Sequence, residues 1–236
     1  MIFNKTQIKL FYLIIITFII NYNCQAEGMW GSILNIELNK KISDFFTIEL
    51  EGEHRTRKNM TENDRWKIDL LTSYKINKFL KVGTGYNYIY YNHETKDWEN
   101  RHRYFINITG SVKINQFKIN LVERIQGTYR EGISEYNKNE IKIRSNPKYI
   151  LRSKLAIEYD IINCKFTPEI STELFYSLND VEENNLYKIR YTGTGEYKIN
   201  NNNYIKLFFR YSTFHNFNED DDESNKIIGI GYKIKF

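Results

Sequence analysis

The sequence predicts an all-β protein: an antiparallel up-and-down transmembrane β-barrel of roughly ten to twelve strands that follows a cleaved signal peptide. Three observations carry this prediction. Polar and apolar residues alternate with a period of two in long runs, the pattern of amphipathic strands. Short turns and longer polar stretches join these runs alternately, which is typical of outer-membrane barrels. Aromatic residues make up 16% of the chain, an enrichment that favours strands.

Residues 1–26 form the predicted signal peptide. Two lysines precede a short apolar stretch, and Cys24 and Ala26 then occupy a small-x-small cleavage site. We therefore expect export, cleavage after Ala26 and a single barrel domain over residues 27–236. Two alternatives stay open: a lipoprotein acylated at Cys24, which the preceding Asn-Tyr-Asn disfavours, and an uncleaved membrane anchor.

Loss of the signal peptide changes the charge balance. The whole chain has a formal net charge of +5, and removal of the two leader lysines leaves 32 basic against 29 acidic residues, a net charge of +3. That small excess, without a clustered basic patch, does not predict a nucleic-acid partner. Cys164 is then the single cysteine, so we expect no disulfide within the mature chain.

A hairpin pattern recurs along the mature chain. An alternating run, a short polar turn and a second alternating run occur at residues 38–46, 74–82, 112–120, 159–167 and 197–205. Each repeat corresponds to one up-and-down pair of strands with its outer loop. The expected strands, in order, are 30–40, 44–57, 65–77, 79–92, 101–114, 116–130, 148–161, 163–178, 186–200, 203–217 and 226–236.

The length of these runs separates a membrane barrel from a soluble antiparallel sandwich, which would also alternate. The runs are about 11–15 residues long, whereas strands of globular proteins average about 5–6 and membrane strands need about 9–11. Aromatic residues flank the apolar faces, as expected of interfacial girdles. The chain ends with Tyr232, Ile234 and Phe236 on one face, which we interpret as a barrel-assembly signal.

The predicted strand count stays open between ten and twelve. Eleven runs conflict with the even numbers of single-chain bacterial barrels. Either the first run is not a full wall strand, which gives ten, or a further strand lies within residues 139–145, which gives twelve.

Residues expected to face the lumen are dense in both signs of charge. The candidate site residues are Arg55, Arg57, Arg101, Arg103, Arg130, Arg152, Arg190 and Arg210, with Glu49, Glu51 and Glu173. Two interpretations compete. A cross-strand ladder of ion pairs would fill the lumen and fix the register, because a charge in a low-dielectric interior needs a partner. An arginine ring would instead form an anion-selective constriction. We favour the ladder, and we expect side chains to fill so small a lumen.

No catalytic or metal-binding motif is visible in the sequence. The histidines are His54, His93, His102 and His215, and neither GxSxG nor HExxH occurs. His102 and Ser111 share a run, but nine residues of strand span about 30 Å. A cross-strand pair of His54 with a serine stays open. The acidic run at 219–223 lacks the spacing of a calcium loop, so we expect no metal and no cofactor.

The order of features in the chain resembles an uncharacterised bacterial outer-membrane family, domain of unknown function 2490. The residues that carry this resemblance are Trp30, Arg124, LRSKLAIEYDI at 151–161, CKFTPEISTELFYSL at 164–178, NLYKIRYTGTGEYKIN at 185–200, YIKLFFRYST at 204–213 and IIGIGYKIKF at 227–236. The resemblance implies an outer-membrane barrel, but no reaction and no functional residues.

The sequence therefore favours an outer-membrane protein that acts as a structural or binding surface barrel with a salt-bridged lumen. A narrow channel for small anionic solutes is the second hypothesis, and an enzyme acting on envelope lipids is the third. The expected partners are outer-membrane lipid and the barrel-assembly machinery. The oligomeric state is open.

Overall fold

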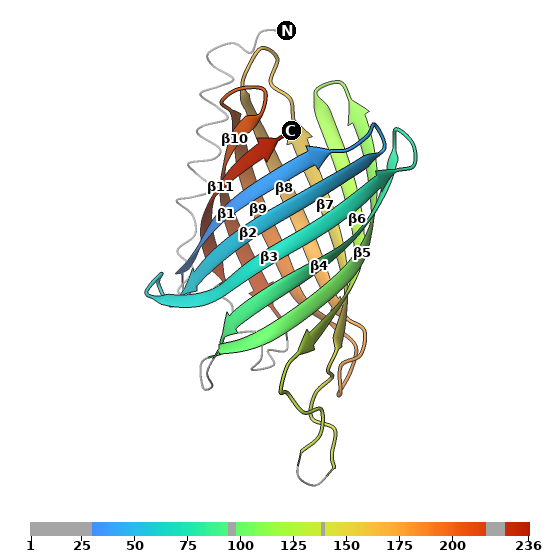
Figure 1. Ribbon diagram of the computed structural model, residues 1–236, viewed down its shortest axis with the longest axis vertical. Coiled ribbons are helices and arrows are strands. Elements are labelled where there is room, and N and C mark those ends of the chain that lie inside the picture. Colours follow the sequence, from blue (N-terminus) through green and yellow to red (C-terminus); the bar gives the residue numbers. More distant parts are fainter. Residues whose placement is uncertain (1–29, 94–97, 138–139, 216–224) are drawn as a thin grey trace.

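The computed structural model describes residues 30–93, 98–137, 140–215 and 225–236, and the strands in these ranges close into one barrel (Figure 1). The strands are β1 Trp30–Lys41, β2 Phe46–Arg57, β3 Glu62–Lys75, β4 Leu80–Asn92, β5 Trp98–Ile114, β6 Phe117–Arg130, β7 Lys148–Tyr159, β8 Phe166–Ser177, β9 Leu186–Lys198, β10 Asn203–Phe214 and β11 Lys226–Lys235. The sequence-based ranges differ from these bounds by three residues at most. The expected signal peptide, with Ala26, lies outside the described residues.

The structure shows eleven strands in the described residues, within the expected range but at neither even number. Trp30–Lys41 is a full wall strand, so the count does not fall to ten. In the proposed extra strand at 139–145, the described residues contribute only a single bridge, between Tyr136 and Lys142, so the count does not rise to twelve. When successive strands alternate in direction and their number is odd, the first and last strands point the same way. β1 and β11 are accordingly parallel, while every other neighbouring pair is antiparallel.

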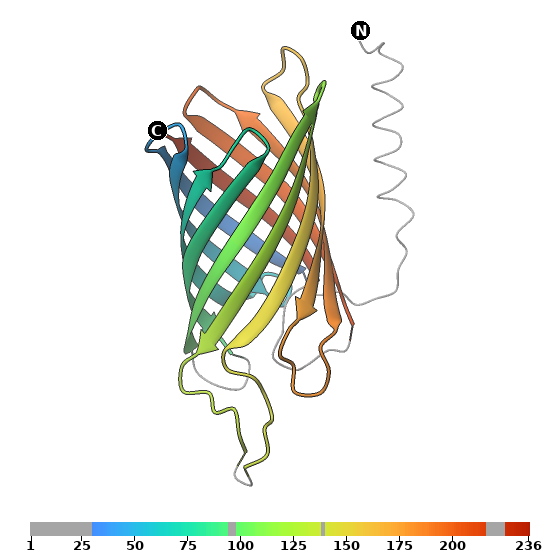
Figure 2. The same cartoon turned by 90° about the vertical axis from the view of Figure 1, so that its right-hand side faces the viewer.

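The two ends of the barrel differ. Short turns join β1 to β2, β3 to β4, β5 to β6, β7 to β8 and β9 to β10, and the chain ends on the same side (Figures 1 and 2). The longest connections, residues 131–147, 178–185 and 215–225, lie at the opposite end, where the segment between β6 and β7 extends furthest (Figure 2). The β2–β3 connection at that end, residues 58–61, is as short as the turns of the other end. No helix in the described part of the chain is long and apolar enough to cross a membrane.

The outer surface is apolar and carries aromatic residues near both ends. Leu34, Ile68 and Ile106 are among its exposed aliphatic side chains. Exposed aromatic residues near the short turns are Phe45, Tyr74, Phe79, Phe117, Phe166 and Tyr197, and those nearer the long loops are Trp30, Tyr88, Tyr90, Tyr129, Tyr149 and Tyr176. This is the distribution expected of a lipid-facing band between two interfacial girdles.

The C-terminal strand is held against β1 as well as β10. The backbone NH of Phe236 donates to Asn39 O at 2.9 Å, and the Lys41 NH donates to Phe236 O at 3.3 Å. Tyr232 lies on the outer face, Ile234 is half-buried and Phe236 is exposed. On the inner face, Gly229 lies beneath the ring of Phe208, and a Cβ atom at this glycine would lie only 1.9 Å from that ring.

Candidate functional site

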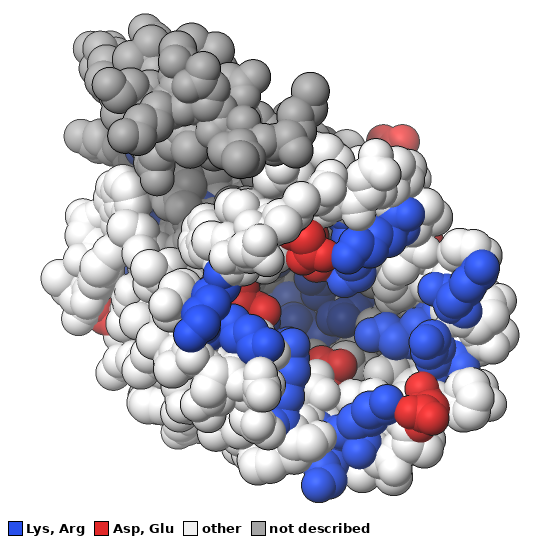
Figure 3. Space-filling model, turned by 90° about the horizontal axis from the view of Figure 1, so that it is seen from above, with Lys and Arg blue, Asp and Glu red and all other residues white. Residues whose placement is uncertain are grey.

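The lumen contains a cavity of about 1000 Å³. Its lining includes Asp44, Asn77 and Lys78 from the short turns, and no residue from the described parts of the long loops. The cavity therefore opens at the short-turn end. Figure 3 looks into this mouth and shows basic side chains around the opening and at its depth. Side chains thus fill only the loop-side part of the lumen, not the whole of it as the sequence led us to expect.

The loop-side part of the lumen is closed by a packed layer of buried charged and aromatic side chains. The ring of Tyr91 lies between two guanidinium groups, with its centroid 5.0 Å from Arg65 and 3.6 Å from Arg101. Asp64, only 1% exposed, accepts a hydrogen bond from Arg65 Nε at 2.9 Å and lies 3.8 Å from Arg55 Nε. We call this layer the loop-side plug; its other buried members include Arg57 and Arg130.

One wall of the cavity is acidic. Glu37, Glu51 and Asp69 are directly opposite one another on β1, β2 and β3, so three carboxylates form a row across adjacent strands. Such like-charged neighbours repel one another unless a cation lies between them. Lys67 Nζ fills this role, at 3.5 Å from Glu51, 3.2 Å from Glu53 and 2.6 Å from Asp69.

The row of carboxylates is also neutralised at Glu37, its end on β1. Lys206 and Lys233 contact Glu37 at 2.9 and 2.6 Å. Glu49 lies one inward position nearer the short turns than Glu51 and lines the same cavity.

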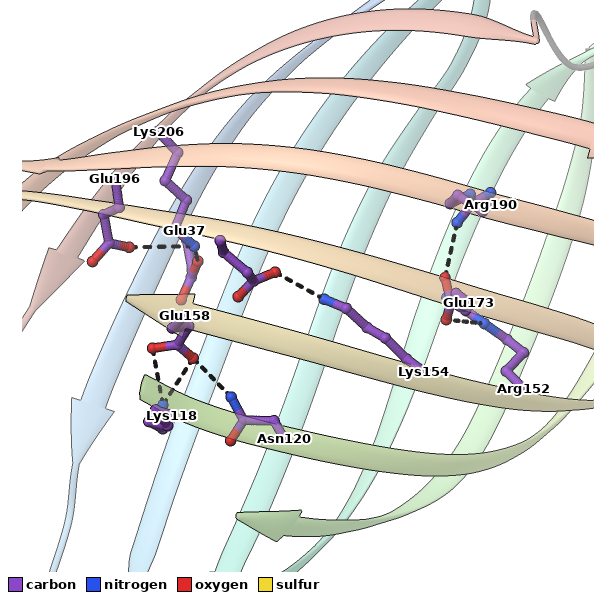
Figure 4. A network of polar contacts seen from close by, with 11 residues as sticks. Glu37, Lys118, Asn120, Arg152, Lys154, Glu158, Glu173, Arg190, Glu196 and Lys206 are labelled. Atoms are coloured by element: carbon purple, nitrogen blue, oxygen red, sulfur yellow. Dashed lines mark hydrogen bonds and ion pairs between the residues drawn. The ribbon is translucent and has the colours of Figure 1, made fainter. Parts of the chain in front are cut away.

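The facing wall is dominated by arginine. Glu173 on β8 accepts two bonds from Arg152, at 2.6 and 2.9 Å, and one from Arg190 at 3.4 Å (Figure 4). Arg152 in turn is directly opposite Arg124 on β6, so two cations are neighbours on one face. Arg103 lines the same part of the cavity.

Nearer the mouth, the pairs are of opposite sign. Lys118 binds Glu158 at 2.9 Å and Lys154 binds Glu169 at 3.3 Å (Figure 4).

In the middle of the lumen, like charges are directly opposed at Glu51 and Asp69 and at Arg124 and Arg152. Opposite charges are directly opposed there too, at Glu53 and Lys67 and at Glu173 and Arg190. Of the described residues, eighteen lysines and arginines line the cavity, against ten aspartates and glutamates. The mature chain as a whole was expected to carry an excess of three positive charges, so the lumen holds more positive charge than the rest of the chain. An anion entering the cavity meets a favourable potential, strengthened by the low dielectric of the surrounding barrel.

The structure brings the candidate residues of the sequence together in two groups. Arg55, Arg57, Arg101 and Arg130 belong to the loop-side plug, and Arg55 and Arg101 also line the cavity where it meets the plug. The other candidates line the rest of the cavity: Arg103, Arg152, Arg190, Arg210, Glu49, Glu51 and Glu173.

The period-two pattern places Lys67 and Arg124 among the residues that face the lumen, but sequence reasoning did not select them, or Asp64, as site residues. Asp64 could not be found in this way, because a register shift after Arg55 places both Asp64 and Arg65 inward.

The histidines on the strands face outward and contact no serine among the described residues. His54 bonds Asn63 at 3.0 Å and packs against Trp66. Glu131, in the loop after β6, accepts hydrogen bonds from Asn100 Nδ2 and His102 Nε2, each at 2.8 Å. These two bonds lower the pKa of the Glu131 carboxyl.

Nowhere in the described ranges do three or more potential metal-ligating side chains gather.

Of three comparisons with known proteins, two find matches. A search of curated proteins finds no match. A solved structure of the NanC porin is similar in fold, with a TM-score of 0.56 and 14% sequence identity; the similarity covers 89% of this chain and 98% of that one. The family described as "Protein of unknown function (DUF2490)" matches residues 27–223. Because this match spans most of the chain, the chain belongs to the DUF2490 family and has a porin-like β-barrel fold.

Proposed function

We propose that the protein lies in an outer membrane and forms a narrow channel that admits small anionic solutes. The observation that carries this proposal is the concentration of positive charge in the lumen, where the described part of the chain places eighteen basic and ten acidic residues. A ladder of ion pairs alone does not require such an excess, because it would pair cations with anions one to one. The porin-like fold is consistent with this role.

The membrane placement is supported by the outer surface of the barrel. Its exposed aliphatic band between two sets of aromatic residues suits contact with outer-membrane lipid. By the usual arrangement of bacterial barrels, the short turns and the open mouth of the cavity face the periplasm, and the long loops face outward. The exposed aromatic C-terminus at the short-turn end supports recognition by the barrel-assembly machinery.

The loop-side plug makes a surface-binding or structural barrel the second candidate. Its buried residues close the cavity on the long-loop side, and a fixed plug would prevent conduction. In a channel, the same layer would be the constriction, and it would have to rearrange for a solute to pass.

Planar-bilayer recording of the refolded full chain separates the two candidates. An anion channel gives discrete conductance steps, and its reversal potential in a KCl gradient lies toward the chloride equilibrium value. Arg103→Glu should abolish or invert this selectivity. Lys142→Glu makes the same charge change at an exposed position in a long loop, so it should leave selectivity unchanged. A silent bilayer after verified insertion would reject the channel and leave the surface-binding barrel.

A further inference from the structure

Three arginines in the cavity, Arg103, Arg124 and Arg210, lack a carboxylate partner among the described residues. Within the described ranges, no acidic side chain lies within ion-pair distance of Arg103 or Arg124. Arg103 Nε donates to the hydroxyl of Thr128 at 3.0 Å, and the guanidinium of Arg124 lies 3.9 Å from the ring centroid of Phe105. A hydroxyl and an aromatic face orient a guanidinium group, but neither carries a full negative charge.

The neighbours of these arginines increase the positive charge. Arg124 is directly opposite Arg152 on the neighbouring strand, and Arg103 lines the same cavity. Among the residues that the structure describes, Glu173 is the one acid bonded to this group, and Arg152 and Arg190 share it. Like charges on directly opposed strand positions destabilise a sheet, so an anion placed among them would be stabilising.

A neutral donor completes the cluster. Gln126 is almost fully buried between Arg124 and Thr128 on β6, and its Oε1 accepts a hydrogen bond from Arg152 Nη1 at 3.0 Å. That bond fixes the orientation of the amide, and the structure shows no acceptor for its nitrogen among the described residues. Arg103, Arg124 and Gln126 thus present hydrogen-bond donors, with no negative charge of their own, to the cavity that they line.

Access to the cluster is from one side. The cavity reaches the short-turn mouth, where Lys118, Lys233 and Lys235 line the approach, and the loop-side plug closes the other side. A volume of about 1000 Å³ is sufficient for a small organic solute. The planar fork of arginine matches carboxylate and phosphate oxygens with two parallel hydrogen bonds, which a halide ion cannot accept in that geometry.

We propose that Arg103 and Arg124, together with Arg152 and the amide of Gln126, form a saturable binding site for a small solute bearing a carboxylate or phosphate group, entered from the short-turn mouth. This inference rests on the proposed admission of anions to the lumen and deepens it. It assigns the selectivity to a specific oxyanion site instead of to the average charge of the cavity.

Isothermal titration calorimetry of the refolded full chain in detergent tests the site, with inorganic phosphate and citrate as separate probes. We expect saturable binding of at least one probe, weakened at high salt. Binding of phosphate alone assigns a phosphate site, binding of citrate alone assigns a carboxylate site, and binding of both assigns a general oxyanion site. Arg124→Gln should weaken binding at least tenfold, because a charge-assisted bidentate contact is lost.

Two further variants keep the test decisive. Lys81→Gln removes one positive charge from the cavity lining at the short-turn end of β4, and it should change affinity less than threefold. Arg124→Lys keeps the charge and removes the fork, so it should weaken binding even where the glutamine variant fails to fold. The proposal is overturned if neither probe binds saturably, or if Arg124→Gln or Arg124→Lys binds no more weakly than Lys81→Gln. Anion-selective conductance without probe binding would reject this site alone, and probe binding without conductance would reject the channel alone.

Discussion

Replacing Glu173 with glutamine tests how the arginine wall is neutralised. Glu173 bonds Arg152 at 2.6 and 2.9 Å and Arg190 at 3.4 Å, and all three side chains are buried to 15% exposure or less. At about 4 Å between charge centres and an effective dielectric constant of about 20, each ion pair contributes about 4 kcal/mol of attraction. Rehydration through the open cavity offsets part of the loss, so we expect the variant to be less stable by about 3–5 kcal/mol.

The free energy of unfolding can be measured by urea titration of the barrel refolded in detergent, followed by tryptophan fluorescence. Glu158→Gln is the matched control, because Glu158 has a lysine partner near the cavity mouth and both side chains are more exposed. Its loss should be about 1 kcal/mol or less. Adding Arg190→Gln to Glu173→Gln should restore part of the stability by removing a now unpaired cation. Equal losses for Glu173→Gln and Glu158→Gln would refute the reasoning.

Three other predictions follow from the walls and the loops. Lys67→Met leaves three neighbouring carboxylates without their shared cation, so it should destabilise the barrel by about 3–5 kcal/mol and shift the reversal potential toward cations in bilayer recording. Gly229→Ala should destabilise the barrel by about 1–3 kcal/mol through overpacking, whereas Gly193→Ala, which has open space at its Cβ, should stay within about 0.5 kcal/mol in the same urea assay. Hydrogen bonds lower the pKa of Glu131 in the folded state, so its contribution to stability is present at neutral pH and is lost as the pH falls through that lowered value. Wild type and Glu131→Gln should therefore differ in melting temperature at pH 7 and converge in acid; a constant difference would contradict this assignment.

The wall of the barrel was predictable from the sequence because its physical signal is local. In a strand that faces lipid on one side and the lumen on the other, every second residue must change polarity, and this alternation locates β1 to β11 to within three residues. The resemblance to the DUF2490 family pointed to the same architecture; the family match confirms the resemblance, and the closed barrel confirms the architecture.

The closure of the barrel was not predictable in the same way. The alternation of polar and apolar residues along a strand does not depend on the direction of the neighbouring strand, so it cannot show how the first and last strands pair. The expectation of ten or twelve strands came instead from the even strand numbers of bacterial barrels, whereas the structure pairs β1 with β11 in parallel.

The distribution of charge within the lumen was only partly predictable. Parity shows that Glu51 and Arg152 point inward, but which residue is opposite each one depends on the length of every turn. The ladder hypothesis assumed pairs of opposite sign. The register contains such pairs, for example Glu53 with Lys67 and Glu173 with Arg190, but it also aligns Glu51 with Asp69 and Arg152 with Arg124. A single register shift beside Arg55 was enough to hide Asp64, because it breaks the alternation on which the inference rests.

The parallel seam between β1 and β11 has a consequence for the order of folding. Every other strand pair joins neighbours along the chain, whereas Trp30 and Lys226 meet across 196 positions (226 minus 30). Loop-closure entropy grows with the logarithm of the separation, and it makes this contact about 3 kcal/mol harder to nucleate than a hairpin closed by a four-residue turn. The seam should therefore be the last pairing to form. Until it does, the edges of β1 and β11 are open to pairing with another chain.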